Sequence, residues 1–222
     1  MFITQLEYRE KRTATNWKRI KFPLQVNLTA EDAQLPQRLL TIIGSLPAFG
    51  SNAPQHSFTD AICRVTFQAA HSEYMWFAKS TVQDGQLLVD EEELYDKDNT
   101  MLMRRAFGEL TVGDQPVEAI PVEQSMLAQH PESEVLQALQ RAFQRVQHYQ
   151  LTDANLADNW QQIQTAPHGT LLLLDGSALS APLDLSPLTS RQDVQVIATG
   201  CTGLPAELFI TQKGKMISCN VQ

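Results

Sequence analysis

The sequence has few cysteines, no long apolar run and no excess of basic residues, and each shortage excludes a class of protein. The three cysteines, Cys63, Cys201 and Cys219, are odd in number and have no C-x-x-C spacing. They therefore predict small, reduced, partly buried side chains rather than a disulfide framework. No stretch approaches the roughly eighteen apolar residues of a membrane span. The first residues, MFITQLEYREKR, carry charges where a secretory signal needs an apolar core, so a cytoplasmic protein is expected.

The net charge of −8 argues against broad attraction to the phosphates of nucleic acids or membranes, although a local basic patch stays open. What the sequence does have is a 43% apolar content over 222 residues, which is typical of a soluble globular protein. That length suits one domain with a substantial core, so we expect a single compact unit over residues 1–222.

The N-terminal half is dominated by strand patterns. Residues 2–8 alternate apolar and polar side chains, and residues 20–28 are predicted as a second strand, near an edge or a bulge because of Pro23. A short helix is predicted over 39–46. Strand patterns then recur at 61–67, 72–80, 85–98 and 100–112. Residues 1–112 therefore predict an antiparallel, β-rich part.

The pattern changes in the C-terminal half. Residues 131–150 place apolar side chains on one face of a long helix, and residues 153–166 predict a second helix with Asp153 as its N-cap. Residues 169–175 and 193–200 are predicted as buried strands, followed by a hairpin over 207–221. We therefore expect an α/β protein with a helical part over 113–166 and a sheet part with parallel strands over 167–222.

The order of these segments resembles the ABC-type ATPase domain of the SMC, RecF and OLD lineage. It is most similar to the compact AAA-type ATPases of prokaryotic defence loci, such as Septu-like systems and retrons. The likeness is carried by the opening hairpin, by YMWFAKS, by VDEEELYDKDNTMLMRR and by QSMLAQHPESEVLQALQRAFQRVQHY. The resemblance implies an ABC-ATPase-like P-loop fold over nearly the whole chain, with a phosphate-binding loop after the first hairpin.

The stretch that matches the phosphate-binding loop is EDAQLPQR. Glu31 stands at the first glycine of G-x-x-x-x-G-K-[ST], Pro36 at the second, Gln37 at the lysine and Arg38 at the hydroxyl residue. The two acidic residues that open the stretch repel a triphosphate, and proline removes a donor N–H group. The resemblance therefore implies that ordinary nucleotide binding is lost, with no cofactor and no metal.

Three further elements depart from the family pattern. In the signature loop, LTDAN has Asp153 and Ala154 in place of Ser-Gly. Asp175 ends its strand as the magnesium-supporting carboxylate would, but Gly176 stands at the general base. Cys201 replaces the switch histidine. If the fold is that of an ATPase, its chemistry is absent.

Two classes of function follow. The first is a catalytically inactive, ATPase-like binding or scaffold subunit, which the resemblance places in an anti-phage defence complex. Its partner would be a second copy, an active ATPase relative or a nuclease effector. The second class is enzymatic, either a divergent nucleotide hydrolase that uses Asp175 or a hydrolase with Cys201 as nucleophile and His168 and Asp175 elsewhere in the chain.

Other chemistry-bearing residues have plainer interpretations. The five histidines have no paired-ligand spacing and predict no zinc site: His56, His71, His130, His148 and His168. The acidic run DEEEL over 90–94 is typical of a solvated face, with a metal or DNA-mimic patch as its alternative. Tyr74, Trp76 and Phe77 are expected in a core, and an exposed aromatic pair would instead indicate an interface.

Overall fold

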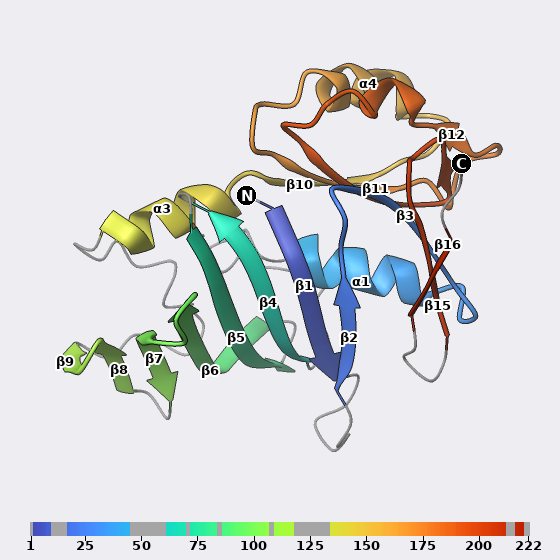
Figure 1. Ribbon diagram of the computed structural model, residues 1–222. Helices are drawn as coiled ribbons and strands as arrows, with labels where there is room; N and C mark the ends of the chain where they lie inside the picture. Colours follow the sequence, from blue (N-terminus) through green and yellow to red (C-terminus); the bar gives the residue numbers. More distant parts are fainter. Residues whose placement is uncertain are drawn as a thin grey trace. The chain divides into compact units, whose positions relative to one another are not determined.

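The computed structural model describes residues 2–9, 17–44, 61–69, 72–83, 86–106, 109–117, 134–211 and 216–219. It is a mixed α/β structure with an antiparallel part and a parallel part, as expected (Figure 1). The chain divides into two compact units. We call them the antiparallel-sheet unit, residues 3–21 and 45–144, and the parallel-sheet unit, residues 1–2, 22–44 and 145–222.

The antiparallel-sheet unit is built on eight strands in the order β2-β1-β4-β5-β6-β7-β8-β9. Their bounds are β1 Phe2–Arg9, β2 Lys18–Lys21, β4 Ala61–Ala69, β5 Ser72–Gln83, β6 Gln86–Asp96, β7 Met101–Ala106, β8 Glu109–Val112 and β9 Gln115–Val117. The pair β1 and β2 and the run from β4 to β9 are antiparallel. The expected hairpins of this half are thus confirmed.

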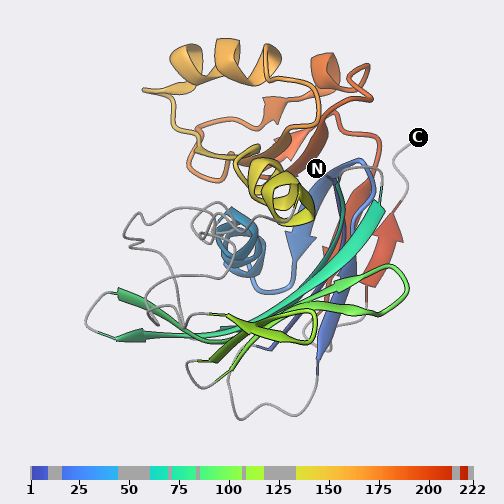
Figure 2. The ribbon, with the colours of Figure 1, turned by 90° about the vertical axis from the view of Figure 1, so that its left-hand side faces the viewer.

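One face of this sheet is covered by helix α3 (Glu134–Phe143), the yellow helix of Figure 2. Phe143 of α3 meets Phe67 and Trp76, with ring centroids 5.1 and 6.0 Å apart. Because side chains alternate along a strand, Trp76 is fully buried on this face while its neighbour Phe77 points to the other. The aromatic residues therefore do not all enter the core.

The parallel-sheet unit has six strands in the order β10-β11-β13-β3-β15-β16. Their bounds are β3 Gln25–Ala30, β10 Val146–Gln150, β11 Leu171–Asp175, β13 Gln195–Thr199, β15 Glu207–Ile210 and β16 Met216–Cys219. All neighbours are parallel except β15 and β16. The earliest strand, β3, is thus inserted between two strands that come from the end of the chain.

Helices cover both faces of the parallel sheet (Figure 1). Helix α4 (Leu156–Gln164) packs through Ile163 on the face that carries Leu172 and Leu174. Helix α1 (Leu35–Gly44) contacts β3, β10, β11 and β13 on the opposite face. Because both faces are covered, β11 and β13 are buried at every position, which explains the run of four leucines in β11.

Small elements complete this unit. The short strands β12 (Leu183–Asp184) and β14 (Cys201–Thr202) pair in parallel as a two-stranded sheet. A 3₁₀ turn, η2 (Ser186–Leu188), adds Leu188 to the core between α4 and the parallel sheet. None of the described helices has the length and apolar character needed to cross a lipid bilayer.

Three predicted elements were wrong. The predicted strand 20–28 is two strands, β2 and β3, which belong to different sheets and are separated at Phe22–Leu24. The predicted helix 131–150 ends at Phe143, and residues 146–150 form β10, because pairing with β11 outweighs the local helical pattern. Asp153 does not cap α4. The N-cap is Asn155, whose Oδ1 accepts a hydrogen bond from the Thr152 N–H at 2.8 Å.

Candidate functional site at the carboxyl edge of the parallel sheet

The residues predicted to mark the degenerate nucleotide site come from segments far apart in the sequence. Gln37 lies in the first turns of α1, which follows β3, whereas Asp175 ends β11 and Cys201 follows β13. All three strands are parallel, so their carboxyl ends lie at one edge of the sheet. In open α/β sheets this edge is where ligands bind. We therefore take this edge as the candidate site.

Gln37, at the position of the phosphate-binding lysine, is engaged with the chain itself. Its Nε2 donates to Ser177 Oγ at 2.5 Å and to Asp175 Oδ2 at 3.3 Å. Asp175 Oδ1 accepts from the Ser177 N–H at 3.1 Å and from Ser177 Oγ at 2.5 Å. Asp175 is 9% exposed. Both of its carboxylate oxygens thus accept hydrogen bonds from side chains and backbone of the same unit.

The other residues of the degenerate loop, EDAQLPQR, form contacts around the start of α1. Asp32 Oδ1 accepts a hydrogen bond from the Gln34 N–H, and its carboxylate forms an ion pair with Arg38. Pro36 is the second residue of the helix, where a missing N–H group costs nothing. The Glu31 N–H donates to the Ile210 carbonyl at 3.1 Å. Arg38 is thus paired with a carboxylate of the same loop.

Gly176 and Gly200 bring two backbone segments into close approach at this edge. A Cβ on Gly176 would lie 2.9 Å from Cys201 Sγ and 3.0 Å from the Gly200 carbonyl oxygen. A Cβ on Gly200, whose φ is +67°, would lie 2.6 Å from the Ser177 nitrogen. The space in which a glutamate at position 176 would begin is therefore occupied by the loop after β13.

Cys201 does not have the surroundings of a nucleophile. Burial, together with the negative charge of Asp175, raises the pKa of its thiol to about 12. His168 precedes β11 and pairs with Asp193 at 3.6 Å, so it lies at the amino edge of the sheet whereas Cys201 lies at the carboxyl edge. β11 spans about 16 Å between those edges. The sequence pair His168 and Cys201 is therefore not assembled into a catalytic pair.

We predict that Cys201 is protected from alkylation in the folded protein. With a pKa of about 12, only on the order of one thiol in ten thousand is ionised at pH 8, and the thiolate is the reactive form. Iodoacetamide treatment followed by peptide mass mapping checks this, with the same protein in urea as the control. Rapid modification of Cys201 in the native protein would contradict its burial.

His148 lies in surroundings that the sequence did not predict. It lies on β10 in register with Leu173, on the face covered by α1. A Cβ on Gly44 would lie 2.7 Å from its Nδ1, and its buried Nε2 has no hydrogen-bond partner among the described residues. Burial lowers the pKa of His148, against the opposing charge of Asp175. Residues 131–150 were predicted as one helix, so the sequence did not indicate that His148 lies on a strand.

The remaining candidates do not join this edge as ligands. Asp153 Oδ1 accepts hydrogen bonds from the Ser180 N–H and Oγ, both at 3.2 Å. Within the described ranges, no group of three or more His, Cys, Asp and Glu side chains is arranged to hold a metal ion. His56, His71 and His130 lie outside the described residues.

The acidic run of β6 is paired rather than exposed as a patch. Glu91 meets Lys79 at 3.5 Å and Glu93 meets Arg104 at 3.4 Å on one face of the sheet. Glu92, on the other face, is fully buried 3.8 Å from Arg105. Alternation along the strand therefore divides the run between a solvated face and the core.

Comparisons with known proteins add little to this geometry. No family model matches the chain, and no curated protein matches it. Among solved structures, the chain is similar to the SMC head domain from Thermotoga maritima, with 10% sequence identity and a TM-score of 0.39. That likeness covers 100% of this chain and 100% of the other. We assign no family from this neighbour.

Proposed function

We propose that the protein is a catalytically inactive, ATPase-like domain that acts by binding a protein partner. The observation that carries the proposal is the network at the carboxyl edge of the parallel sheet. Gln37 stands where the resemblance puts a phosphate-binding lysine, and its amide donates to Asp175 and Ser177. A neutral amide adds no positive charge for a triphosphate, and it occupies the carboxylate that would support magnesium.

The same edge supports the proposed absence of hydrolysis. Attack of water on a phosphoryl group needs a residue that orients the water, and Gly176 supplies no side chain. The close approach of Cys201 Sγ and the Gly200 carbonyl leaves no room for a carboxylate there without backbone movement. The hydrogen bonds and close contacts at this edge thus stabilise the fold at the position where an active ATPase would hold its nucleotide.

The proposed role is that of a binding or scaffold subunit. Nucleotide-dependent relatives of the resembled family work as dimers, so a second copy of the chain is the first candidate partner. The other candidate partners are an active ATPase relative and a nuclease effector in a defence complex. This part of the proposal is carried by analogy with the resemblance, since a fold does not dictate a function.

We predict that the purified protein does not bind ATP at its parallel-sheet edge. Isothermal titration with Mg-ATP at millimolar concentration is expected to give the same heat for the wild-type protein and for Asp175→Asn. The reason is that the Asp175 carboxylate already accepts hydrogen bonds from Gln37 and Ser177. Any change of the thermal unfolding midpoint with ligand is expected to be the same in the wild-type protein and in Asp175→Asn. Micromolar affinity together with turnover that Asp175→Asn abolishes would establish the divergent hydrolase instead.

The binding role has its own measurement. Size-exclusion chromatography with light scattering, followed by affinity capture from the native host, is expected to show a dimer or a stable complex with a defined stoichiometry. A strict monomer that retains no partner in that capture would count against a scaffold role, while leaving the absence of ATP binding unaffected.

A further inference from the structure

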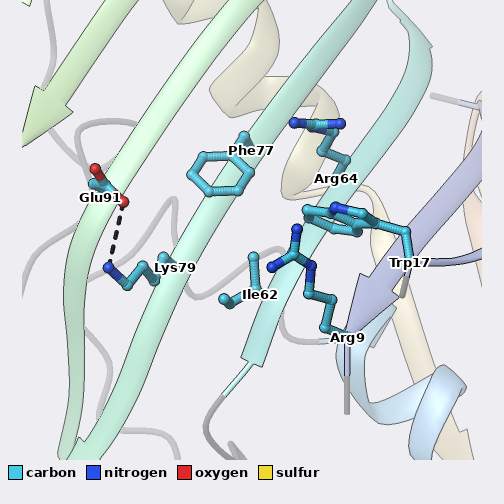
Figure 3. Close-up of a pocket in the computed structure, with 7 residues that line it drawn as sticks. All are labelled: Arg9, Trp17, Ile62, Arg64, Phe77, Lys79 and Glu91. Carbon is cyan, nitrogen blue, oxygen red and sulfur yellow. Dashed lines mark ion pairs between the residues drawn. The ribbon is translucent and has the colours of Figure 1, made fainter. Parts of the chain in front are cut away.

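A concave surface lies on the face of the antiparallel sheet that α3 does not cover. Its volume is about 500 Å³, and it is lined by side chains of β1, β4, β5 and β6 together with Trp17, just before β2 (Figure 3). We call it the arginine-tryptophan pocket. It lies wholly within the antiparallel-sheet unit, so its chemistry is independent of the parallel-sheet edge.

The pocket contains alternating cations and aromatic rings. The Arg9 guanidinium carbon lies 4.4 Å from the centroid of the Trp17 ring, and that of Arg64 lies 4.8 Å from it. Arg64 is also 5.8 Å from the Phe77 centroid, and Figure 3 shows Trp17 between the two arginines. A ring face attracts a guanidinium cation at these distances, and the N–H groups of a guanidinium lie in its own plane, where they can donate to an acceptor.

The positive charge of the pocket is only partly balanced. Among the residues that the structure describes, three cationic side chains line it, Arg9, Arg64 and Lys79, against one carboxylate, Glu91, and these four sum to a net charge of plus two. Lys79 meets Glu91 at 3.5 Å. Glu7, two residues before Arg9 on β1, accepts hydrogen bonds from Arg19 Nε at 2.5 Å and from Arg64 Nη1 at 3.5 Å, so the cation of Arg19 offsets the charge of this further carboxylate.

Arg9 is the least satisfied member of the pocket. Its Nε is buried and has no hydrogen-bond acceptor among the described residues. A buried donor without a partner costs free energy that a bound acceptor would recover. A stack of rings and cations can stabilise a sheet by itself, but it does not explain the unpaired donor or the uncompensated charge. Both features favour an anionic ligand.

We propose that the arginine-tryptophan pocket binds a small organic phosphate monoester with an apolar or aromatic body. A phosphate monoester carries close to two negative charges at neutral pH, which matches the net charge of the pocket, whereas a carboxylate would leave one positive charge over. Arginine edges suit phosphate oxygens. Ile62 and Phe77 give the remaining wall, and the volume lies within the range of small-molecule sites.

Isothermal titration with phenyl phosphate, inorganic phosphate and phenol tests the proposal. Saturable binding is expected for phenyl phosphate, weaker binding for inorganic phosphate and none for phenol, with affinity that falls as salt is raised. Arg9→Gln is expected to weaken phenyl phosphate binding about tenfold or more, since a charge-assisted contact is lost. Arg104→Gln is the matched control, because Arg104 lies on the same sheet, pairs with Glu93 and does not line the pocket.

Circular dichroism shows whether Arg9→Gln keeps the fold, and Lys79→Gln gives a second variant if it does not. No binding of phenyl phosphate by the folded wild-type protein at millimolar concentration would overturn the proposal. So would equal losses in Arg9→Gln and Arg104→Gln. Tighter binding of a phosphate-free acidic peptide or of a short oligonucleotide would assign the pocket to a polymer and also overturn it.

Discussion

Gly200→Ala is expected to destabilise the parallel-sheet unit by about 3–5 kcal/mol, from the sum of backbone strain and overpacking. The φ of +67° is a left-handed conformation, which glycine adopts without cost and an L residue adopts only with strain. The added Cβ would also lie 2.6 Å from the Ser177 nitrogen and 2.7 Å from the Gly176 carbonyl carbon. Those atoms are backbone and cannot rotate away, so the loops after β11 and β13 must separate.

Urea unfolding followed by circular dichroism measures this loss, and Gly113→Ala is its matched control. Gly113 also has positive φ, +58°, but a Cβ there would meet nothing within 4 Å. Only the backbone term applies, and a cost of about 1–2 kcal/mol is expected. If the two variants lost equal stability, the close approach of the two loops would not be a determinant of the candidate site.

Arg105→Met is expected to destabilise the antiparallel-sheet unit by about 3–5 kcal/mol, because removing one partner of a buried ion pair leaves the other charge uncompensated. Arg105 and Glu92 have side chains that are 1% and 0% exposed, with the guanidinium 3.8 Å from the carboxylate. Glu92 would keep the hydrogen bond from Trp76 Nε1 at 3.3 Å. A neutral donor does not replace the charge of a guanidinium in a site that water does not reach.

Arg104→Met is the control for this variant. Arg104 is adjacent in sequence and also pairs with a glutamate, Glu93, at 3.4 Å, but its side chain is 47% exposed. Solvent screens that pair, so a loss of under about 1 kcal/mol is expected. In addition, Glu92→Leu with Arg105→Leu should recover part of the loss of Arg105→Met, since both charges are then removed. Similar losses for the two single arginine variants would contradict the burial of the Glu92 pair.

Two predicted segments show why local pattern and final structure diverge. Residues 131–143 and 146–150 share one apolar periodicity, and the period alone does not reveal that the chain turns at Gln144. β10 is an edge strand and is only partly buried, so it lacks the continuous apolar run that identified β11. In the same way, Pro23 was interpreted as marking an edge or a bulge of one strand, because the sequence does not show that β2 and β3 lie in different sheets.

The candidate site shows the same division. The missing phosphate-loop glycines, the glutamine at the lysine position and the glycine after Asp175 were all visible in the sequence. The hydrogen bonds from Gln37 to Asp175 and Ser177 were not, because they join segments 138 and 140 residues apart. The arginine-tryptophan pocket was likewise hidden, since no spacing in the sequence predicts which strands become neighbours.

By itself, the sequence determined which segments are apolar enough to be buried, where most strands lie and which side chains the phosphate chemistry would lack. Alternation along β6 also placed Glu91 and Glu93 on one face and Glu92 on the other. Only the tertiary structure decided which face α3 covers, and therefore which glutamate is buried with an arginine and which are screened by water. It also decided that β3 lies between β13 and β15, which brings Gln37 to Asp175. The physical reason is that local pattern sets the direction of each side chain, whereas burial and charge pairing depend on contacts between distant segments.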